Sequence, residues 1–428
     1  MRKYLFILLF AAGSMSAWAG VSLDSCREWA RETYPTLRKY DLIDKTEEYT
    51  VKNAAMGWIP KLGISAQATY QSAAANMSEV WSSLGLEDMM KQFGVTIPEM
   101  KMNKFQGKVQ AEVKQTIWDG GASIAQRKTA RAEAEQQRRQ TDVEMQALED
   151  RIDGLYFGIL MLDEQSKQLA HTEALLDTNL SRVKVLCANE MALQSDVDAV
   201  EVERLQVRQK ESEIRNSRQA YRLMLSLFCN KDLQSEELVL QEPQGAGHSR
   251  PEYAALEAQS KLLDVKEKAL WVAAIPKIGA FAQGWYGYPS LDMFKSLTSN
   301  DWRLNGLVGV SMSWNIDGFY TIPLNRKKIA VQRQGLGVQR DLLQFNDKLQ
   351  RTEKASAIAR WDESLKDDEL IVALRTRVRQ AAESKHENGT ITTAELLKAI
   401  TDEQNARITY MLHRISKAKT EYELGKIQ

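Results

Sequence analysis

The chain has 428 residues, and its 57 basic and 57 acidic side chains give it no formal net charge at neutral pH. Balanced charge with no long single-sign block argues against nucleic acid as a partner, because phosphate binding needs a basic surface. The four histidines stand in no metal-ligand spacing, and no set of nucleophile, base and acid is visible. The sequence therefore argues against an enzyme and predicts no cofactor or metal.

Residues 1–19 are predicted to be a secretory signal peptide. Arg2 and Lys3 precede the apolar stretch YLFILLFAAG, and AWA at 17–19 supplies the small residues that signal peptidase requires. No later apolar cluster reaches the roughly 20 residues that a membrane-spanning helix needs. We therefore expect an exported chain starting at Gly20 that is either soluble outside the cytoplasm or held in a membrane by strands.

Four segments alternate apolar or small residues with polar ones, which is the pattern of strands with one buried face. They are residues 58–72, 105–118, 274–288 and 303–316. In the second segment, Val109, Ala111 and Val113 alternate with lysines, a glutamine and a glutamate. A half-buried sheet of a soluble domain shows the same alternation. Segments of about 12 to 15 residues, aromatic residues near their ends and export favour a membrane barrel instead.

A barrel needs more strands than these four. Four strands cannot close a barrel, and an unpaired strand edge is not tolerated inside lipid. The chain is therefore expected to oligomerise. Two copies would give eight strands and a filled interior, whereas three would give twelve strands and room for a pore. Closed symmetry permits both arrangements.

Two long proline-free stretches predict two helical hairpins, because an interior proline breaks a helix. The first helix, from Gly121 to about Leu186, carries an apolar heptad repeat that predicts a coiled-coil seam. Its members are Leu148, Leu155, Leu162, Leu169, Leu176 and Val183, with a second stripe at Ile152, Ile159, Leu180 and Cys187. A break at 188–194 and the N-cap candidate Ser195 precede a second helix that runs to about Cys229.

The same plan recurs in the second half of the chain. A long helix is predicted from about Pro323 to Glu387, and another from Thr393 onward. Gly389, between them, suits the left-handed residue that ends a helix, and Thr392 or Thr393 suits the next cap. Two halves with one plan indicate an internal duplication.

Three cysteines cannot all pair with one another, so at least one is a free thiol. Cys187 and Cys229 are expected at opposite ends of one helix, about 50 Å apart and far beyond disulfide reach. Each is expected to be a small buried hydrophobe.

These features together resemble the TolC-like outer membrane efflux proteins of Gram-negative bacteria. The similarity covers essentially the whole chain after the signal and rests on the duplicated plan and on three motifs. TIWDGG at 116–121 is similar to the family's strand-to-helix turn, and WNIDGF at 314–319 is a looser copy with Phe319 in place of the second glycine. NGTITTAELLKAITDEQNAR at 388–407 is similar to the family's second tip. The corresponding turn residues are Asp119, Gly120, Gly121, Asp317 and Gly318.

The resemblance implies an α+β membrane protein that works as a homotrimer. Three chains would share one twelve-stranded β-barrel in outer membrane lipid, and their long antiparallel coiled-coil hairpins would continue as a periplasmic α-barrel. The implied function is a passive exit channel of a tripartite efflux or type I secretion system. Such a channel is coupled to an inner-membrane transporter through a periplasmic adaptor. The resemblance does not identify the cargo.

The resemblance also assigns a location to each segment, with the two helical tips forming a periplasmic gate. The expected order is a signal peptide at 1–19, an N-terminal periplasmic helix at 20–57, a first strand pair at 58–118 with an extracellular loop at 71–104, a first hairpin at 119–229 with its tip at about 187–195, a linker and periplasmic helix at 230–273, a second strand pair at 274–318, and a second hairpin at 319–428 with its tip at about 386–393. The helices would thus lie in the periplasm and the strands in the outer membrane.

Residues of the two tips are expected to form the gate. Glu395 falls where family members place one aspartate of the aperture, and Lys398 where they place a second, so an all-acidic double ring is not expected. Asp196 matches an acid that holds a basic residue of the second tip, and Ile391 occupies that basic position, so this contact is expected to be absent. His386 replaces a tyrosine of the same network and is expected to be a solvated tip residue.

One alternative remains open from the sequence. An exported coiled-coil protein could act as a structural spacer, with its strands in a small soluble sheet and no channel. A channel would need detergent for extraction and would run as a heat-modifiable trimer, whereas a spacer would be soluble in water.

Overall fold

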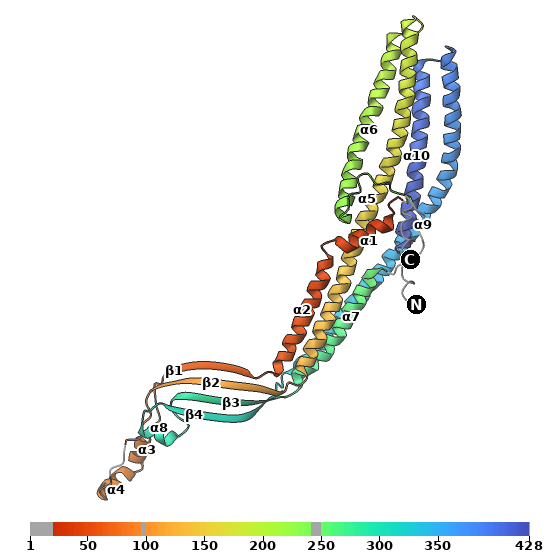
Figure 1. Cartoon of the computed structure of the whole chain (residues 1–428). Helices are drawn as coiled ribbons and strands as arrows, with labels where there is room; N and C mark the ends of the chain where they lie inside the picture. The colour runs from red at the N-terminus through yellow and green to blue at the C-terminus, as the bar shows by residue number, and fades with distance from the viewer. Residues whose placement is uncertain (1–19, 96–98, 241–249, 428) are drawn as a thin grey trace, which may run out of the picture. The chain divides into compact units, whose positions relative to one another are not determined.

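The computed structural model describes residues 20–95, 99–240 and 250–427 (Figure 1). The predicted signal peptide at 1–19 lies outside the described residues. The chain divides into two compact units. Unit 1 comprises Met1–Ile43, Gln137–Glu257 and Leu336–Gln428, and unit 2 comprises Asp44–Gln136 and Ala258–Gly335.

Unit 2 contains an antiparallel sheet of four strands in the order β1-β2-β3-β4 (Figure 1). The strands are β1 (Lys61–Tyr70), β2 (Phe105–Trp118), β3 (Lys277–Tyr288) and β4 (Arg303–Ser313). Each alternating segment of the sequence contains one strand, so the prediction of four strands is confirmed. The central pair, β2 and β3, brings together parts of the chain that are separated in sequence by the whole first hairpin.

The register of the sheet separates its side chains into two faces, because paired residues point to the same side. The set that we call the apolar face includes Leu62, Ile64, Ala66, Ala68, Val109, Ala111, Val113, Ala280, Ala282, Tyr286, Leu304, Val308, Val310 and Met312. The set that we call the polar face includes Lys61, Ser65, Gln67, Lys108, Gln110, Glu112, Lys114, Lys277, Gln283, Arg303, Asn305 and Ser311. Phe281, Trp285 and Leu307 are the large apolar members of the polar face.

The apolar face is uncovered in the described chain. Ile64 is 78% exposed, Leu304 82% and Val308 78%. The strand order also leaves β1 and β4 with one unpaired edge each. A sheet with these properties requires an apolar environment on one side and further strands at its edges.

The segments that join the strands of each pair contain short helices. The predicted loop at 71–104 includes α3 (Met77–Ser83) and α4 (Leu86–Gln92), and the second connection includes α8 (Met293–Thr298). Asn76 caps α3 by accepting a hydrogen bond from the backbone N–H of Ser78 over 3.1 Å. Helices of six or seven residues are too short for apolar periodicity to reveal them.

Two helices precede β1 where one was predicted at 20–57. They are α1 (Leu23–Thr33) and α2 (Leu37–Ala55), and Tyr34 ends α1 in an extended conformation. The single-helix prediction is wrong because Pro35 keeps the residue before it out of the helical region. A short 3₁₀ turn then leads through Pro60 into β1, and helix α7 (Pro251–Leu270) leads in the same way through Pro276 into β3.

Both predicted helical hairpins are present. The first consists of α5 (Ala122–Ala188) and α6 (Gln194–Cys229), and the second of α9 (Gly318–Glu387) and α10 (Thr393–Gly425). Helix α9 begins five residues before the predicted start at Pro323, which it tolerates inside its second turn. In the described ranges, no helix is both long and apolar enough to cross a membrane.

The core of unit 1 is built on the predicted seam of α5. One cluster joins α5 to α1, α6 and the C-terminal part of α10, with Tyr156, Phe157 and Leu225 fully buried. Towards the tips, a second cluster contains Leu169, Leu176, Val207, Ile214, Leu396 and Ile400. A third contains Leu180, Val183, Val197 and Val200. The apolar heptad therefore packs α5 against its own hairpin partner and against α10.

Candidate functional site

The second tip joins α9 to α10 through a turn with a defined cap. Gly389 has a φ of 70°, the left-handed conformation that ends a helix without steric cost. The Thr392 side chain accepts a hydrogen bond from the backbone N–H of Glu395 over 3.3 Å. The Glu395 carboxylate accepts one from the backbone N–H of Thr392 over 3.0 Å, which completes a capping box.

Glu395 and Lys398 are both exposed on the first turns of α10. In the capping box, Glu395 stabilises the N-terminus of α10, a role that the resemblance to the family did not suggest. A ring of such residues needs several chains, so the placement of Glu395 and Lys398 at an aperture stays a prediction.

The first tip uses a similar cap made by different residues. Glu190 adopts a φ of 60°, and the Asp196 carboxylate accepts a hydrogen bond from the backbone N–H of Leu193 over 3.0 Å. The prediction of Ser195 as the N-cap is wrong, because Ser195 already lies inside α6 and Asp196 supplies the acceptor from the third helical position. Asp196 and Glu395 occupy matching positions in the two halves of the chain. Each therefore accepts a hydrogen bond from the N-cap residue of its own helix.

The two tips are joined by contacts that the sequence did not reveal. Arg182 of α5 forms an ion pair of 2.9 Å with Glu387 of α9. Leu396 of α10 packs in the same buried cluster as Leu176 of α5, and Ile391 lies partly buried at its edge. Ile391 thus makes an apolar contact at the position where the family has a basic residue.

His386 is buried, and the expectation of a solvated tip residue is wrong. Its side chain is 8% exposed, and its Nε2 lies 3.2 Å from Oγ1 of Thr393. The turn at Gly389 returns the chain so that Thr393 covers the ring. The Nδ1 atom is buried without a hydrogen-bond partner in the described residues. No group of three potential metal ligands occurs in the part of the chain that the structure describes.

A buried carboxylate, Glu403, lies between the two helices of the second hairpin. It accepts hydrogen bonds from Oγ1 of Thr376 over 2.8 Å and from Nη2 of Arg407 over 2.7 Å, and Arg379 pairs with its other oxygen. Burial alone would raise the pKa of Glu403. The hydrogen bonds from Thr376, Arg407 and Arg379 outweigh burial and hold this pKa below its ordinary value.

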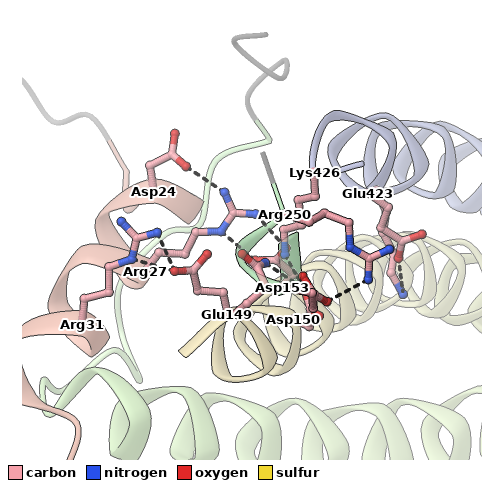
Figure 2. A network of polar contacts seen from close by, with 12 residues as sticks. Asp24, Arg27, Arg31, Glu149, Asp150, Asp153, Arg250, Glu423 and Lys426 are labelled. Carbon is pink, nitrogen blue, oxygen red and sulfur yellow. Dashed lines mark hydrogen bonds and ion pairs between the residues drawn. The ribbon is translucent and has the colours of Figure 1, made fainter. Parts of the chain in front are cut away.

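A second polar network joins the N-terminal helix to the hairpins of unit 1 (Figure 2). Arg27 of α1 makes a two-pronged contact with Asp153 of α5 at 2.8 and 2.7 Å. Arg31 donates to Glu149 over 2.6 Å. Lys426, just beyond α10, pairs with Asp153 at 2.5 Å and also with Asp150. The network connects α1 and Lys426 to α5, and we assign it a structural role.

The first strand-to-helix turn is organised by Asp119. Its carboxylate accepts hydrogen bonds from the backbone N–H groups of Gly121 and Ser123 over 2.8 and 2.7 Å, and so caps α5. Gly120 and Gly121 have φ values of 65° and 86°, which only glycine adopts without strain. A Cβ on Gly120 would also lie 3.0 Å from the Ile275 side chain.

The second turn has another construction. Its backbone turn is closed by N–H groups of Tyr320 and Thr321, which donate to the carbonyl oxygen of Asp317. Gly318 is buried, and a Cβ there would approach the backbone of Ala273 and Ala274 to 3.3 Å. Phe319, in place of the family's second glycine, packs edge-on against Trp314. Close packing therefore explains the glycine at 318, whereas backbone conformation explains those at 120 and 121.

The polar face carries an open hollow of about 920 Å³ at the helix end of the sheet. Its lining includes Lys61, Glu112, Lys114, Lys277 and Ser123. Lys114 pairs with Glu112 at 2.8 Å, and the Gln283 amide donates to Glu112 over 2.6 Å. The hollow is wide, and its lining has no set of groups placed for acid–base or nucleophilic chemistry in the described residues.

Cys26 of α1 and Cys229 of α6 lie together in the core of unit 1, which the sequence did not suggest. The Cys229 thiol donates to the carbonyl oxygen of Cys26 over 3.5 Å. Hydrogen bonding to Cys229, together with burial, raises the pKa of the Cys26 thiol. Cys187 lies in the last turn of α5 and is partly exposed, so the expectation that Cys187 and Cys229 share one helix is wrong.

The fold is shared with solved structures of outer membrane channels. The chain is similar to the outer membrane protein VceC of Vibrio cholerae, with a TM-score of 0.65, 14% identity and 94% of both chains covered. It is similar to the CmeC channel of Campylobacter jejuni, with a TM-score of 0.64, 11% identity, and 94% of this chain and 85% of that chain covered. For the open state of the MtrE channel of Neisseria gonorrhoeae, the TM-score is 0.63 at 13% identity, with coverage of 95% and 88%.

Comparison of the sequence itself adds no relatives. No protein-family model matches the chain, and no curated protein matches it significantly. At identities of 11 to 14%, the structural similarity establishes the fold. The chain therefore has the fold of the TolC-like outer membrane channels, as the resemblance of its sequence predicted.

Proposed function

We propose that the chain is the subunit of an outer membrane channel, a passive trimeric exit duct of a tripartite efflux or secretion system. The observation that carries the proposal is the sheet of unit 2, which has one polar face and one uncovered apolar face. Side chains such as Ile64, Leu304 and Val308 are more than three-quarters exposed, which is unfavourable in water and favourable in lipid. The shared fold with outer membrane channels supports the same conclusion.

The unpaired strand edges support an oligomer, and the twelve strands that a pore needs favour the trimer. In lipid, an edge strand has no water to satisfy its backbone N–H and C=O groups, so β1 and β4 need partners. Pairing β4 of one copy with β1 of the next would close the sheet, and three copies would supply twelve strands around a pore. The exposed apolar residues of α9 would give the copies a second contact. Those in its first half within unit 1 are Val338, Leu342, Phe345 and Leu349.

The proposed assembly places the strands in the outer membrane and the helices in the periplasm. The loop at 71–104, with α3 and α4, would lie at the outer surface, and the tips at about 187–195 and 386–393 would form the periplasmic gate. The gate residues would be Asp196, His386, Gly389, Ile391, Glu395 and Lys398. A periplasmic adaptor would dock at the tips, and an inner-membrane transporter would drive cargo into a conduit that is itself passive.

Two lysine substitutions test which face of the sheet meets lipid. Val308→Lys places a charge on the apolar face of β4, and Ser311→Lys places the same charge on the polar face of the same strand. A lysine facing the middle of a bilayer costs about 2–4 kcal/mol in a β-barrel. We expect Val308→Lys to reduce the amount of heat-modifiable trimer in the outer membrane fraction, and Ser311→Lys to leave that amount near the level of the unaltered protein.

The same preparation distinguishes the channel from the structural alternative. The unaltered protein should require detergent for extraction, and the purified trimer should give stepwise conductance in planar bilayers. A mature chain that is water-soluble and monomeric, with equal tolerance of both lysines, would instead support an exported coiled-coil spacer.

A further inference from the structure

The charged side chains of the sheet are all on one of its faces. The four strands contain six of them, namely Lys61, Lys108, Glu112, Lys114, Lys277 and Arg303. The pairing register places each on the polar face. Five are basic and one is acidic, so this face is strongly unbalanced although the chain as a whole has no net charge.

The basic residues form two levels along the strands. Lys61 lies opposite Lys114 at the helix end of the sheet, and Lys277 begins β3 at the same end. Lys108 and Arg303 both pair with Gly287 near the other end. Lys114 lies six positions after Lys108 on β2, which corresponds to about 20 Å at the rise of a strand. An ion moving along the polar face would pass both levels in turn.

Nearby acids offset only part of this positive charge. Glu112 is held by Lys114 at 2.8 Å and by Gln283, and Arg303 has a contact of 3.6 Å with the exposed Asp301. Lys61 and Lys277 have no acidic partner in the described ranges. Lys108 makes a cation–π contact of 6.0 Å with the Trp285 ring, which brings no negative charge, and it has no acidic partner in the described residues.

Asp119 also lines the hollow at the helix end of the sheet, but its carboxylate caps a helix. Its carboxylate accepts two backbone hydrogen bonds at the N-terminus of α5, where the helix dipole already compensates a negative charge. Counting Asp119 and Asp301 together with Glu112, the basic groups of the polar face remain in excess.

From this placement we infer that the polar face is an electropositive section of the pore, so that the channel conducts anions in preference to cations and favours anionic cargo. The inference rests on the proposed function, because it needs several copies with their polar faces around one lumen. Three copies would triple the excess of positive charge. Lipid behind the barrel wall has a low dielectric constant and would concentrate the field in the lumen. The Debye length of about 8 Å at physiological salt would limit the effect to ions that pass near the wall.

The reversal potential of the purified trimer in a planar bilayer tests the inference. Under a KCl gradient near 0.1 M, where the Debye length is about 10 Å, we expect chloride to be at least about twice as permeant as potassium. The double variant Lys108→Gln/Lys114→Gln should lower this preference, and Lys108→Glu/Lys114→Glu should reverse it. The charge-conserving control, Lys108→Arg/Lys114→Arg, should keep the preference of the unaltered channel.

Two different failures can be told apart. A conducting trimer that prefers potassium, or whose chloride preference is the same in the Gln, Glu and Arg variants, would overturn the electropositive section and leave the channel function standing. A correctly folded, detergent-extracted protein without any conductance would overturn the channel function and the inference with it. Circular dichroism and the heat-modifiable mobility of each variant establish that the substitutions left the assembly intact.

Discussion

The first helices of the two hairpins, α5 and α9, have similar lengths of 67 and 70 residues but are held in unit 1 by different forces. Helix α5 buries an apolar seam, in which Leu148, Ile152, Ile159, Leu176 and Val183 are at most 4% exposed. From Leu336 onward, the buried residues of α9 are Asp347, Asp368 and His386, and all three are titratable.

Each of these three buried side chains makes a polar contact with another helix. Asp347 accepts a hydrogen bond from the Tyr253 hydroxyl over 2.6 Å and pairs with Arg250. Asp368 lies 2.6 Å from Nδ1 of His413 on α10. These hydrogen bonds and ion pairs attach α9 to the rest of unit 1 but bury little apolar surface.

Eight large apolar residues of α9 in unit 1 are exposed in the single chain. They are Val338, Leu342, Phe345, Leu349, Leu370, Ile371, Leu374 and Val378, each at least 44% exposed. The two halves of a duplicated chain thus use the same kind of helix in opposite ways. Helix α5 buries its apolar surface within the chain, whereas large apolar side chains of α9 are exposed in the single chain, which agrees with the proposed trimer.

We expect the largest loss of stability from a substitution in the apolar seam of α5. Leu176→Ala removes a side chain with no exposed surface, and such a change costs about 3–5 kcal/mol. We expect a lowered free energy of unfolding for the helical part of the chain, measured by denaturant titration with circular dichroism in detergent. The matched control is Leu374→Ala on α9, where the side chain is 52% exposed.

Leu374→Ala should cost less than about 1 kcal/mol in a dissociated chain, because little surface is removed from contact. Equal losses for Leu176→Ala and Leu374→Ala would contradict the contrast between α5 and α9.

We expect the second largest loss of stability when the polar contacts of a buried carboxylate are removed. Glu403→Ala removes the carboxylate that compensates Arg379 and Arg407, and breaking a buried pair in this way costs about 3 kcal/mol. A matched control is Glu213→Ala, since Glu213 pairs with Lys210 at an exposed site where such a contact contributes below about 1 kcal/mol. If both variants unfold at the same denaturant concentration, the buried contacts of Glu403 do not contribute to the stability of the second hairpin.

We expect a substitution at an exposed apolar residue of α9 to weaken the proposed trimer. Phe345 is 60% exposed in the single chain, and a neighbour would bury it in the proposed trimer. Phe345→Ala should weaken trimer formation by about 2 kcal/mol per interface, because buried aromatic residues are frequent hot spots. The temperature at which the trimer dissociates in gel electrophoresis should fall. An unchanged dissociation temperature would show that α9 does not carry the interface.

A smaller effect is expected from pH. The pKa of Glu403 is held below its ordinary value of 4.5, so the unfolded chain takes up this proton more readily than the folded one. The stabilisation by Glu403 is therefore fully present above about pH 4.5. It is lost as the pH falls through the lower folded-state value. Thermal unfolding followed between neutral and acidic pH should show this loss in the unaltered protein and a weaker acid dependence in Glu403→Ala.

The sequence predicted the features whose causes are local. The heptad of α5, the left-handed Gly389 and the cap at Thr392 depend on a few neighbouring residues, and the structure contains all three. The alternation of the strands was also sufficient to place them. The division of the sheet into an apolar face and a polar face could be foreseen because a strand repeats every two residues.

The features that the sequence did not predict depend on partners far along the chain. Asp347 and Asp368 look like solvated positions of a polar helix until Arg250 and His413 are known to lie beside them. His386 is covered by Thr393 only because the tip turns back on itself. Apolar periodicity carries no information on such polar contacts, so the different anchoring of α9 emerged only from the structure.

The smallest expected effect on stability is at the second tip, where α9 ends. Glu395→Gln keeps a side chain that can accept the hydrogen bond from the backbone N–H of Thr392, so the capping box can form. We expect the free energy of unfolding to change by less than about 0.5 kcal/mol. The substitution does remove one negative charge per chain at the proposed aperture.

Ion selectivity therefore decides whether Glu395 lies at the aperture. Removing this negative charge should shift the reversal potential further towards chloride, the opposite direction from the glutamine substitutions at Lys108 and Lys114. Asp196→Asn is the matched control at the first tip, because Asp196 also caps a helix, and the resemblance matches it to a contact between the tips rather than to the aperture ring. A shift for Glu395→Gln alone would support the aperture, whereas no shift in either variant would leave Glu395 with its helix-capping role alone.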